Sequence, residues 1–276
     1  MVVIPHWHPS QNYGPRKKGG HPQLIVLHYT SMDTTEAALQ RLFDPQHEVS
    51  AHYLISPKGI IWQMVDEAQR AWHAGAGCWD DIEDVNSQSI GIELANRGNH
   101  PFAEAQMVAL EGLLQGVMAR WSLTASSLIA HSDLAIGRKF DPGARFDWRR
   151  LACQGLAVWP DPVAGGDFYT DTAAFGYRMP GDDAQAAAAL LDAFRLRFRP
   201  MAQGPLDAID CALAAGLREL RDASRAGIYV RPNSRLRAPY WLRPTPHRIK
   251  IKAINKLLCT GSPSTRMPRI TDHIGT

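Results

Sequence analysis

The sequence predicts an α/β fold in which a mixed central β-sheet is flanked by helices and followed by a small α-helical module. Three observations predict this class. Apolar runs and amphipathic stretches follow one another in the order β-α-β-β-β-α-β up to residue 130, which is typical of a sheet covered by helices. Residues 101–121 have apolar side chains at helical spacing. The same spacing returns in 185–198 and 206–220, after a stretch rich in Pro and Gly.

The first predicted strand and helix occupy residues 24–44. Residues 24–28 form a strand-like apolar run that ends at His28. Asp33-Thr-Thr-Glu36 resembles a capping box, in which a small polar side chain and an acid three residues later satisfy the free amides of a helix start. We therefore expect a helix from this box to about Asp44.

A hairpin and a further strand are expected next. Residues 52–56 and 60–65 are β-rich, and the Pro and Gly of Pro57-Lys-Gly59 between them favour a turn. Residues 89–95 form another apolar run, which follows a Gly-rich loop at 72–77. Two β-branched isoleucines and the flanking breakers favour a strand over a helix in this run.

The last part of the predicted sheet leads into a second histidine. Pro101 opens the amphipathic helix, a position that proline favours. Residues 127–130 form a short strand that runs directly into His131, and a short helix is expected near 148–151. Ligands of such sheets tend to bind beyond the carboxyl ends of strands. Because His28 and His131 both lie at such ends, we expect them to converge.

Three parts are predicted along the chain. Residues 1–160 form the sheet-containing domain, 161–224 a small helical module, and 225–276 a basic tail that is expected to be disordered. The Pro, Gly and Asp of 159–170 indicate a linker. Within the tail, 248–258 could form a basic amphipathic helix on a surface.

Composition limits the classes of partner. The chain has a net charge of +3, but the tail holds 11 of the basic residues and a single acid, Asp272, so the rest carries about −7. Such a tail can attract anionic polymers, yet a solvated tail is the simpler interpretation and no nucleic-acid partner is expected.

No apolar run reaches the ~20 residues of a membrane span, and none at the start resembles a leader. We therefore expect a cytoplasmic location, with the periplasm as the alternative. The four cysteines are scattered and are expected to be reduced thiols.

The segment 129–143 brings three chemically capable side chains into one loop, namely His131, Lys139 and Asp141. Together with the distant His28, this loop offers the ligands of an open zinc site, since catalytic zinc takes three ligands from His, Asp or Glu. A histidine at a strand end is often structural, so spacing alone leaves that alternative open.

Two further residues add chemistry to the metal hypothesis. A lysine ammonium two residues before Asp141 could stabilise an oxyanion, which favours a role for Lys139. Glu93 lies inside an apolar run, where a carboxylate is costly to bury unless it is paired or reactive. It could act as a general base that takes a proton from an attacking water and delivers it to the leaving nitrogen. A strand residue on a polar face is the alternative.

Five sequence blocks occur in a fixed order. They are His28-Tyr-Thr, Ser50-Ala-His-Tyr-Leu-Ile, Arg70-Ala-Trp-His-Ala-Gly, Asn86-Ser-Gln-Ser-Ile-Gly-Ile-Glu-Leu, and the segment 129–143. In this order they resemble the zinc-dependent N-acetylmuramoyl-L-alanine amidases of the AmpD and AmiD type, the amidase-2 family, which has a peptidoglycan-recognition-protein-like fold. The resemblance covers residues from about 10 to 160 and implies that 1–160 is the catalytic domain.

The resemblance also implies site residues. It implies that His28, His131 and Asp141 are the zinc ligands, and that Glu93 and Lys139 are the catalytic pair. All five are present, which favours an active enzyme over a relative that only binds.

Other polar and aromatic residues have less certain roles. The Trp-His-Ala-Gly block lies along the substrate groove of this family, so Trp72 and His73 are expected to contact the sugar or the stem peptide, with a core aromatic and a loop spacer as the alternative. His52 is expected to be structural because the ligand set is complete without it. Arg138 could contact a stem-peptide carboxylate, but a solvated charge is the simpler interpretation.

The implied activity is hydrolysis of the amide between the lactyl group of N-acetylmuramic acid and L-alanine of the stem peptide, in peptidoglycan or in muropeptides, anhydro forms included. Residues 171–222 are similar to a three-helix peptidoglycan-binding module, on Phe175-Gly-Tyr177 and 191–198. The alternatives are a peptidoglycan- or muropeptide-binding protein without activity and a related zinc hydrolase for another amide. A monomer is expected.

Overall fold

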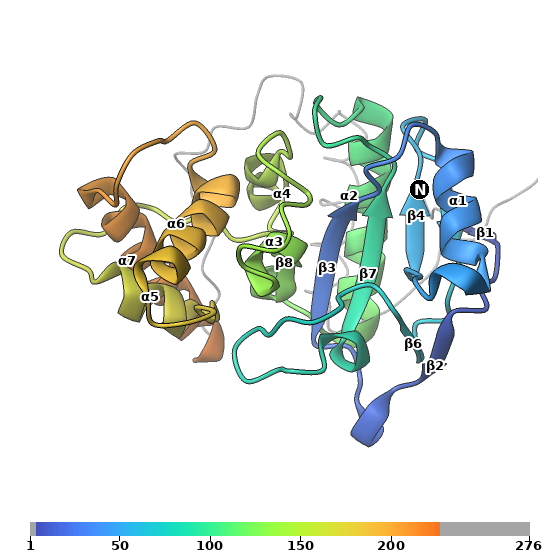
Figure 1. Cartoon of the computed structure of the whole chain (residues 1–276), viewed down its shortest axis with the longest axis horizontal. Helices are drawn as coiled ribbons and strands as arrows, with labels where there is room; N and C mark the ends of the chain where they lie inside the picture. The colour runs from blue at the N-terminus through green and yellow to red at the C-terminus, as the bar shows by residue number, and fades with distance from the viewer. Residues whose placement is uncertain (1–3, 227–276) are drawn as a thin grey trace, which may run out of the picture. The chain divides into compact units, whose positions relative to one another are not determined.

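A computed structural model of the chain describes residues 4–226, apart from the side chain of Lys18. It contains a six-stranded mixed sheet with helices on both faces and a group of three further helices (Figure 1). The predicted α/β class is therefore confirmed. Nearly all of the predicted tail, with the basic helix expected at 248–258, lies outside the described residues. No helix within 4–226 has the length and hydropathy to span a membrane.

The main sheet has the strand order β1-β5-β4-β7-β3-β8. Its strands are β1 (His6–Trp7), β3 (Leu24–Tyr29), β4 (Tyr53–Ile55), β5 (Ile61–Gln63), β7 (Ser89–Leu94) and β8 (Leu128–Ala130). β4 and β5 form the predicted antiparallel hairpin, whereas the pairs β4-β7, β7-β3 and β3-β8 are parallel. The four parallel strands therefore end at the same edge of the sheet.

Three short strands are not predicted by the sequence. β1 pairs with β5 at one edge of the main sheet. β2 (Tyr13–Pro15) and β6 (Gln69–Ala71) form a separate antiparallel pair. Each of these strands has only two or three residues, which is too few for an alternating pattern to appear.

Alternate residues of β3 face opposite sides of the sheet. Ile25 and Leu27 belong to an apolar cluster with α2, whereas Leu24 and Val26 belong to a second cluster with the C-terminal helices. A strand that is buried on both faces has a continuous apolar sequence, as this one does. Because side chains alternate along a strand, His28 lies on the same face as Leu24 and Val26.

The helices of the sheet-containing part are α1 (Thr35–Phe43), α2 (Glu104–Trp121), α3 (His131–Leu134) and α4 (Trp148–Cys153), with short 3-10 turns at η1 (Lys17–Gly19), η2 (Pro45–His47), η3 (Val85–Gln88) and η4 (Ala125–Ser127). The helix expected from residue 33 is capped one position later than predicted, because the side chain of Thr34 accepts the amide of Ala37 at 3.1 Å. In Figure 1, α2 lies behind β3 and β7, where its apolar side packs on Ile25 and Leu27.

The C-terminal helices are α5 (Phe168–Phe175), α6 (Ala184–Phe198) and α7 (Ala208–Arg225). α6 and α7 match the two predicted helical segments. α5 begins inside the stretch that we interpreted as a linker, 159–170, because Phe168 is an almost fully buried side chain rather than a solvated one. All three helices contribute to the cluster that also contains Leu24, Val26 and Ile129 of the sheet.

Candidate metal centre

The carboxyl ends of three parallel strands hold the candidate site. His28 is the penultimate residue of β3, and Glu93 lies opposite it in the register with β7. β8 ends at Ala130, and His131 is the first residue of α3. Because neighbouring residues in register share a face, His28 and Glu93 project side by side, and the sheet brings His131 next to them.

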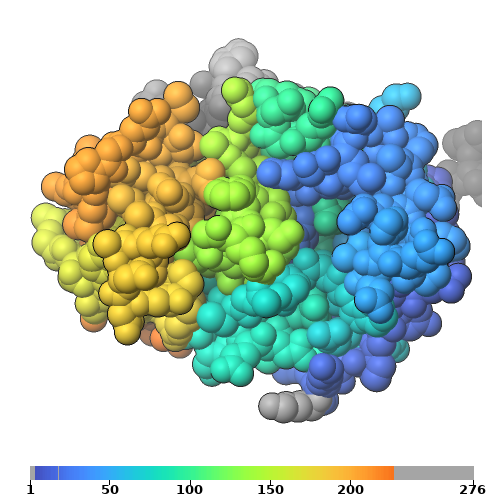
Figure 2. Space-filling view, viewed as in Figure 1, coloured from blue at the N-terminus to red at the C-terminus, as the bar shows by residue number. Residues whose placement is uncertain are grey.

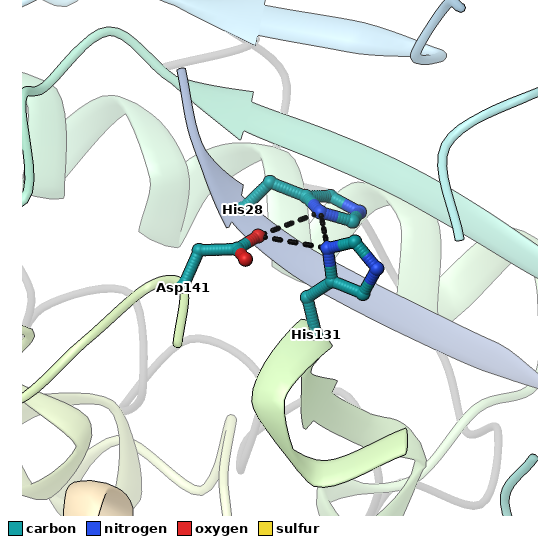
Figure 3. A group of neighbouring side chains, drawn as sticks. All are labelled: His28, His131 and Asp141. Carbon is teal, nitrogen blue, oxygen red and sulfur yellow. Dashed lines mark hydrogen bonds and ion pairs between the residues drawn. The ribbon is translucent and has the colours of Figure 1, made fainter. Parts of the chain in front are cut away.

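Three of the predicted residues converge on one point (Figure 3). His28 Nδ1 lies 2.9 Å from His131 Nδ1 and 2.9 Å from Asp141 Oδ2, and His131 Nδ1 lies 3.0 Å from the same oxygen. All three residues are buried. A metal bound by such atoms at about 2.0–2.2 Å is surrounded by ligand atoms about 3 Å apart or slightly more, so these donors fit a small divalent ion.

The charge states of this group also suit a metal. Burial lowers the pKa of His28 to about 4, and the neighbouring His131 contributes to the shift. Burial alone would raise the pKa of Asp141, but hydrogen bonds from His131 and His28 outweigh it and hold that pKa well below its usual range. Neutral imidazole and ionised carboxylate are the forms that bind a metal, and at neutral pH His28 and Asp141 are in these forms.

Each imidazole is held by its second nitrogen. His28 Nε2 lies 3.0 Å from His73 Nδ1, and His131 Nε2 lies 3.0 Å from the carbonyl oxygen of Ala74. When a metal takes the two Nδ1 atoms, each Nε2 would carry the proton and donate it to these acceptors. His73 Nε2 then donates to Ser89 Oγ at 3.1 Å. The loop at 72–77 therefore holds both histidine rings in place.

Gly91 makes room for His73 on the sheet. A Cβ atom at this position would lie 2.4 Å from Cγ of the His73 ring, which no side chain can tolerate. Below it, the fully buried His52 accepts the amide of Gly91 at Nδ1, at 2.9 Å, and its Nε2 lies 3.1 Å from the carbonyl oxygen of Gln69. These backbone contacts agree with the structural role expected for His52.

The side chain of Glu93 has a carboxyl oxygen without a hydrogen-bond partner in residues 4–226. Its Oε2 is buried and has no hydrogen-bond partner among the described residues. Burial raises the pKa of Glu93 to about 8, the Asp141 carboxylate adds to the shift, and Lys139 opposes it. A partly buried carboxyl that can take up and release a proton near neutral pH is suited to acid-base chemistry.

The remaining predicted residues lie around this group. Lys139 is partly buried, two residues before Asp141, and its charge lowers the pKa of both His28 and Glu93. Trp72 is partly buried in the loop before His73, and Arg138 is exposed. Sequence reasoning treated His73 as a substrate contact, and the structure places its ring against His28; contact with a substrate stays a prediction for both Trp72 and His73.

The profile of the family described as N-acetylmuramoyl-L-alanine amidase matches residues 18–144. The N-acetylmuramoyl-L-alanine amidase AmiD of Escherichia coli is 36% identical over 230 residues, a match that covers 71% of this chain and 82% of AmiD. This chain belongs to the N-acetylmuramoyl-L-alanine amidase family. The 1,6-anhydro-N-acetylmuramyl-L-alanine amidase AmpD of Haemophilus influenzae is 33% identical over 159 residues, covering 51% of this chain and 86% of AmpD.

Solved structures of this amidase family have the same fold. The complex of E. coli AmiD with anhydro-N-acetylmuramic acid-L-Ala-D-gamma-Glu-L-Lys is 34% identical, with a TM-score of 0.66 over 77% of this chain and 93% of AmiD. AmpDH3 of Pseudomonas aeruginosa is 29% identical, with a TM-score of 0.66 over 80% of this chain and 99% of AmpDH3. The family expected from the sequence blocks is therefore confirmed.

The groups that hold the rings of His28 and His131 in place were not predicted from the sequence. Gly91 lies between the two isoleucines of β7, and a glycine inside a strand is the one sequence signal that another group approaches the sheet closely there. Ser89 precedes it by two residues, on the same face. The partner, His73, comes from a loop whose position depends on contacts that no local pattern contains.

Proposed function

We propose that this chain is a zinc-dependent amidase that hydrolyses the bond between the lactyl group of N-acetylmuramic acid and L-alanine of the stem peptide. The observation that carries the proposal is the convergence of three metal-type donor atoms within 3.0 Å, beside a buried carboxyl oxygen without a partner. The names of AmiD and AmpD, and the muropeptide in the AmiD complex, support the same class of substrate.

The zinc ligands in this proposal are His28, His131 and Asp141. Two imidazole nitrogens and one carboxylate favour zinc over magnesium or calcium, which prefer all-oxygen sites. When bound, zinc supplies Lewis acidity that polarises the scissile carbonyl and makes water more acidic. Three protein ligands leave room in the coordination shell for substrate or water.

Glu93 moves the proton in this reaction. Its carboxylate accepts a proton from the attacking water as the oxygen bonds to the carbonyl carbon, and later gives that proton to the nitrogen of L-alanine as the C–N bond breaks. A pKa raised to about 8 in the metal-free site favours the first half of this cycle, because a higher pKa makes the carboxylate a stronger base, and the proton it takes up is then held until the nitrogen accepts it. The carboxyl oxygen without a partner is free to hold the water.

Lys139 stabilises negative charge on the substrate. The backbone bonds of Lys139 to Ala135 and of Ser132 to Asp141 hold its segment at the metal centre, and in this proposal its ammonium faces the carbonyl oxygen that becomes an oxyanion when water adds. A fixed positive charge at that position lowers the barrier for the addition step. Trp72, in the loop that also carries His73, is proposed to contact the sugar or the stem peptide.

A comparison of two substrates tests the proposed activity and shows which cell compartment its substrate preference fits. The chain is incubated with an anhydro-muropeptide and, separately, with intact murein, and released stem peptide is measured by mass spectrometry. Cleavage restricted to the anhydro-muropeptide fits a cytoplasmic enzyme that recycles imported fragments, and cleavage of intact murein fits the periplasmic alternative and a wall-binding role for 161–224. Release of peptide from neither substrate would contradict the proposal. A monomer is proposed, which light scattering would check.

A protein that binds muropeptides without cutting them is the competing function. It would require no general base next to a metal site, so the Oε2 of Glu93, which has no partner in the described part of the chain, and the raised pKa of this residue favour the enzyme. Zinc content and peptide release, measured on the same sample, separate the two. A zinc-loaded protein that binds muropeptide and releases no peptide would support the competing function.

A further inference from the structure

We propose that the C-terminal helical part positions the metal centre, through Arg197 and Tyr177 acting on Asp133. Both residues lie beyond the sheet-containing part of the chain, in α6 and in the loop before it. Asp133 lies two residues after His131, in the same short helix α3. The inference rests on the proposed function, since it assigns positioning residues to the zinc site named there.

Asp133 is a fully buried carboxylate that is held from three directions. Its Oδ1 accepts the hydroxyl of Tyr177 at 2.8 Å, and its Oδ2 accepts a guanidinium N–H of Arg197 at 2.7 Å. The same Oδ2 also accepts the amide of Ala130 at 2.9 Å. This last contact caps the start of α3 at the residue before His131. Two side chains of the helical part therefore fix the carboxylate that caps α3.

The short helix α3 carries one candidate ligand and is bonded to the segment that carries another. His131 is its first residue, and the amide of Ser132 donates to the carbonyl oxygen of Asp141 at 3.0 Å. The amide of Lys139 donates to the carbonyl oxygen of Ala135 at 3.0 Å, just after the helix. A shift of α3 would therefore move His131, and the backbone bonds that place Asp141 and Lys139, together.

Arg197 links α3 to the elements on either side of it. Its guanidinium donates to the carbonyl oxygen of Leu128, the first residue of β8, at 3.1 Å, and lies 4.1 Å from the ring centroid of Trp148 in α4. The side chains of Arg197 and Asp133 are both 0% exposed. Such a buried pair is weak evidence for stability, because desolvation offsets the attraction. The presence of this pair is better explained by the position that it gives α3 relative to β8 and α4.

Apolar packing places α6 directly against α3. Leu134, Leu190 and Phe194 share one buried cluster, and the side chain of Ala189 would lie 3.2 Å from a Cβ at Gly137, two residues before Lys139. Figure 2 shows the yellow helical segment lying against the yellow-green segment that follows β8. The helical part therefore packs against α3 and the start of the loop that follows it.

Zinc affinity in matched variants tests this inference. We would measure the affinity of the full chain for Zn²⁺ by competition with a chelating dye, for the wild type, Tyr177→Phe, and the double variant Arg197→Met with Asp133→Asn. The double variant removes both charges at similar volume, so no unpaired charge stays buried. We expect it to bind Zn²⁺ about 10–100 times more weakly, as loss of outer contacts to ligands typically does, and Tyr177→Phe to lose affinity in the same direction.

Matched controls exclude a general loss of stability. Arg195 and Asp210 form a second buried pair, 2.5 Å apart, and the side-chain hydrogen bonds of Arg195 stay within the helical part, to Gly204, Pro205 and Asp210. Arg195→Met with Asp210→Asn should lower the melting temperature while Zn²⁺ affinity stays within about threefold of wild type, and the half-exposed Tyr169→Phe should change neither. Wild-type affinity in folded Tyr177→Phe and Arg197→Met/Asp133→Asn proteins, or an equal loss in the control pair, would overturn the inference. A wild-type chain that binds no Zn²⁺ would instead overturn the proposed function.

Discussion

Individual residues at the site have separable tasks. His28, His131 and Asp141 bring their donor atoms within 3.0 Å of one another, whereas Glu93 and Lys139 lie beside this group without belonging to it. The residue types could be proposed from the sequence, because the five blocks resemble a family with a known ligand set. Their mutual distances could not, since these depend on the register of three parallel strands.

The division between ligands and catalytic groups predicts two different defects. His131→Ala should lose zinc and activity together, because one of three ligands is removed. Lys139→Ala should keep its zinc and lose about 2.7–4 kcal/mol of transition-state stabilisation, the usual loss for one oxyanion donor. Metal analysis and kcat/KM on the same preparations check both. A zinc-loaded Lys139→Ala protein at the wild-type rate would contradict the role of Lys139.

His52 predicts a sensitivity to acid that is unrelated to zinc binding. Burial and the nearby Arg16 charge together lower its pKa to about 3, against the opposing effects of Gln69 and Glu67. The unfolded chain therefore takes up a proton below about pH 6.5 that the native chain does not. The free energy of unfolding thus decreases as the pH is lowered from about 6.5 to about 3, by at most about 1.4 kcal/mol per pH unit.

The variant His52→Asn isolates this effect, because its side-chain oxygen can still accept the amide of Gly91. We expect it to be less stable than wild type at pH 7.5 and to approach the wild type as the pH falls toward 5. Urea unfolding of the two metal-free proteins at several pH values measures the difference. Parallel stability curves would show that His52 does not titrate as described.

At the scale of elements, the strands that are buried on both faces were the most predictable. β3 begins with four apolar residues in a row, and β7 has Ile90, Ile92 and Leu94 at alternate positions. The ends of the two strands place His28 and Glu93 side by side. The first helix of the expected three-helix module, α5, begins earlier than predicted, because the Pro and Gly before it dominate the composition of 159–170. The position of His73 against β7 was missed because it depends on a long-range contact.

Packing of the loop at 72–77 on β7 makes Gly91 essential to the site. In Gly91→Ala the new methyl group would collide with the His73 ring, which must then leave His28. We expect a loss of about 1–3 kcal/mol of folding stability from overpacking and Zn²⁺ affinity about 10–100 times weaker. Chelator competition and thermal unfolding would measure the two effects.

Gly14→Ala in β2 is the matched control, since a Cβ there meets nothing within 4 Å. It should leave zinc affinity at the wild-type value. If Gly91→Ala also retained wild-type affinity, the contact between His73 and His28 would not position the ligand.

For the whole molecule, the sheet and the C-terminal helices act on one centre. The sheet supplies His28 and Glu93, and the helical part holds α3 through Asp133. The fold class and the family were predictable because several independent sequence blocks agree. The contact of α6 with Asp133 was not predictable, because no sequence pattern pairs Asp133 with the distant Arg197.

The most direct test of the central claim is release of stem peptide by the zinc-loaded chain. Zinc content is measured first, and the same sample is then incubated with anhydro-N-acetylmuramyl-tripeptide and followed by mass spectrometry. We predict one bound zinc per chain and two products, the anhydro-sugar with a free lactyl carboxylate and the tripeptide with a free amino group on L-alanine. Glu93→Gln should retain zinc and lose about 10²–10⁴-fold in rate. A zinc-loaded wild-type chain that binds this substrate and releases no tripeptide would contradict the account.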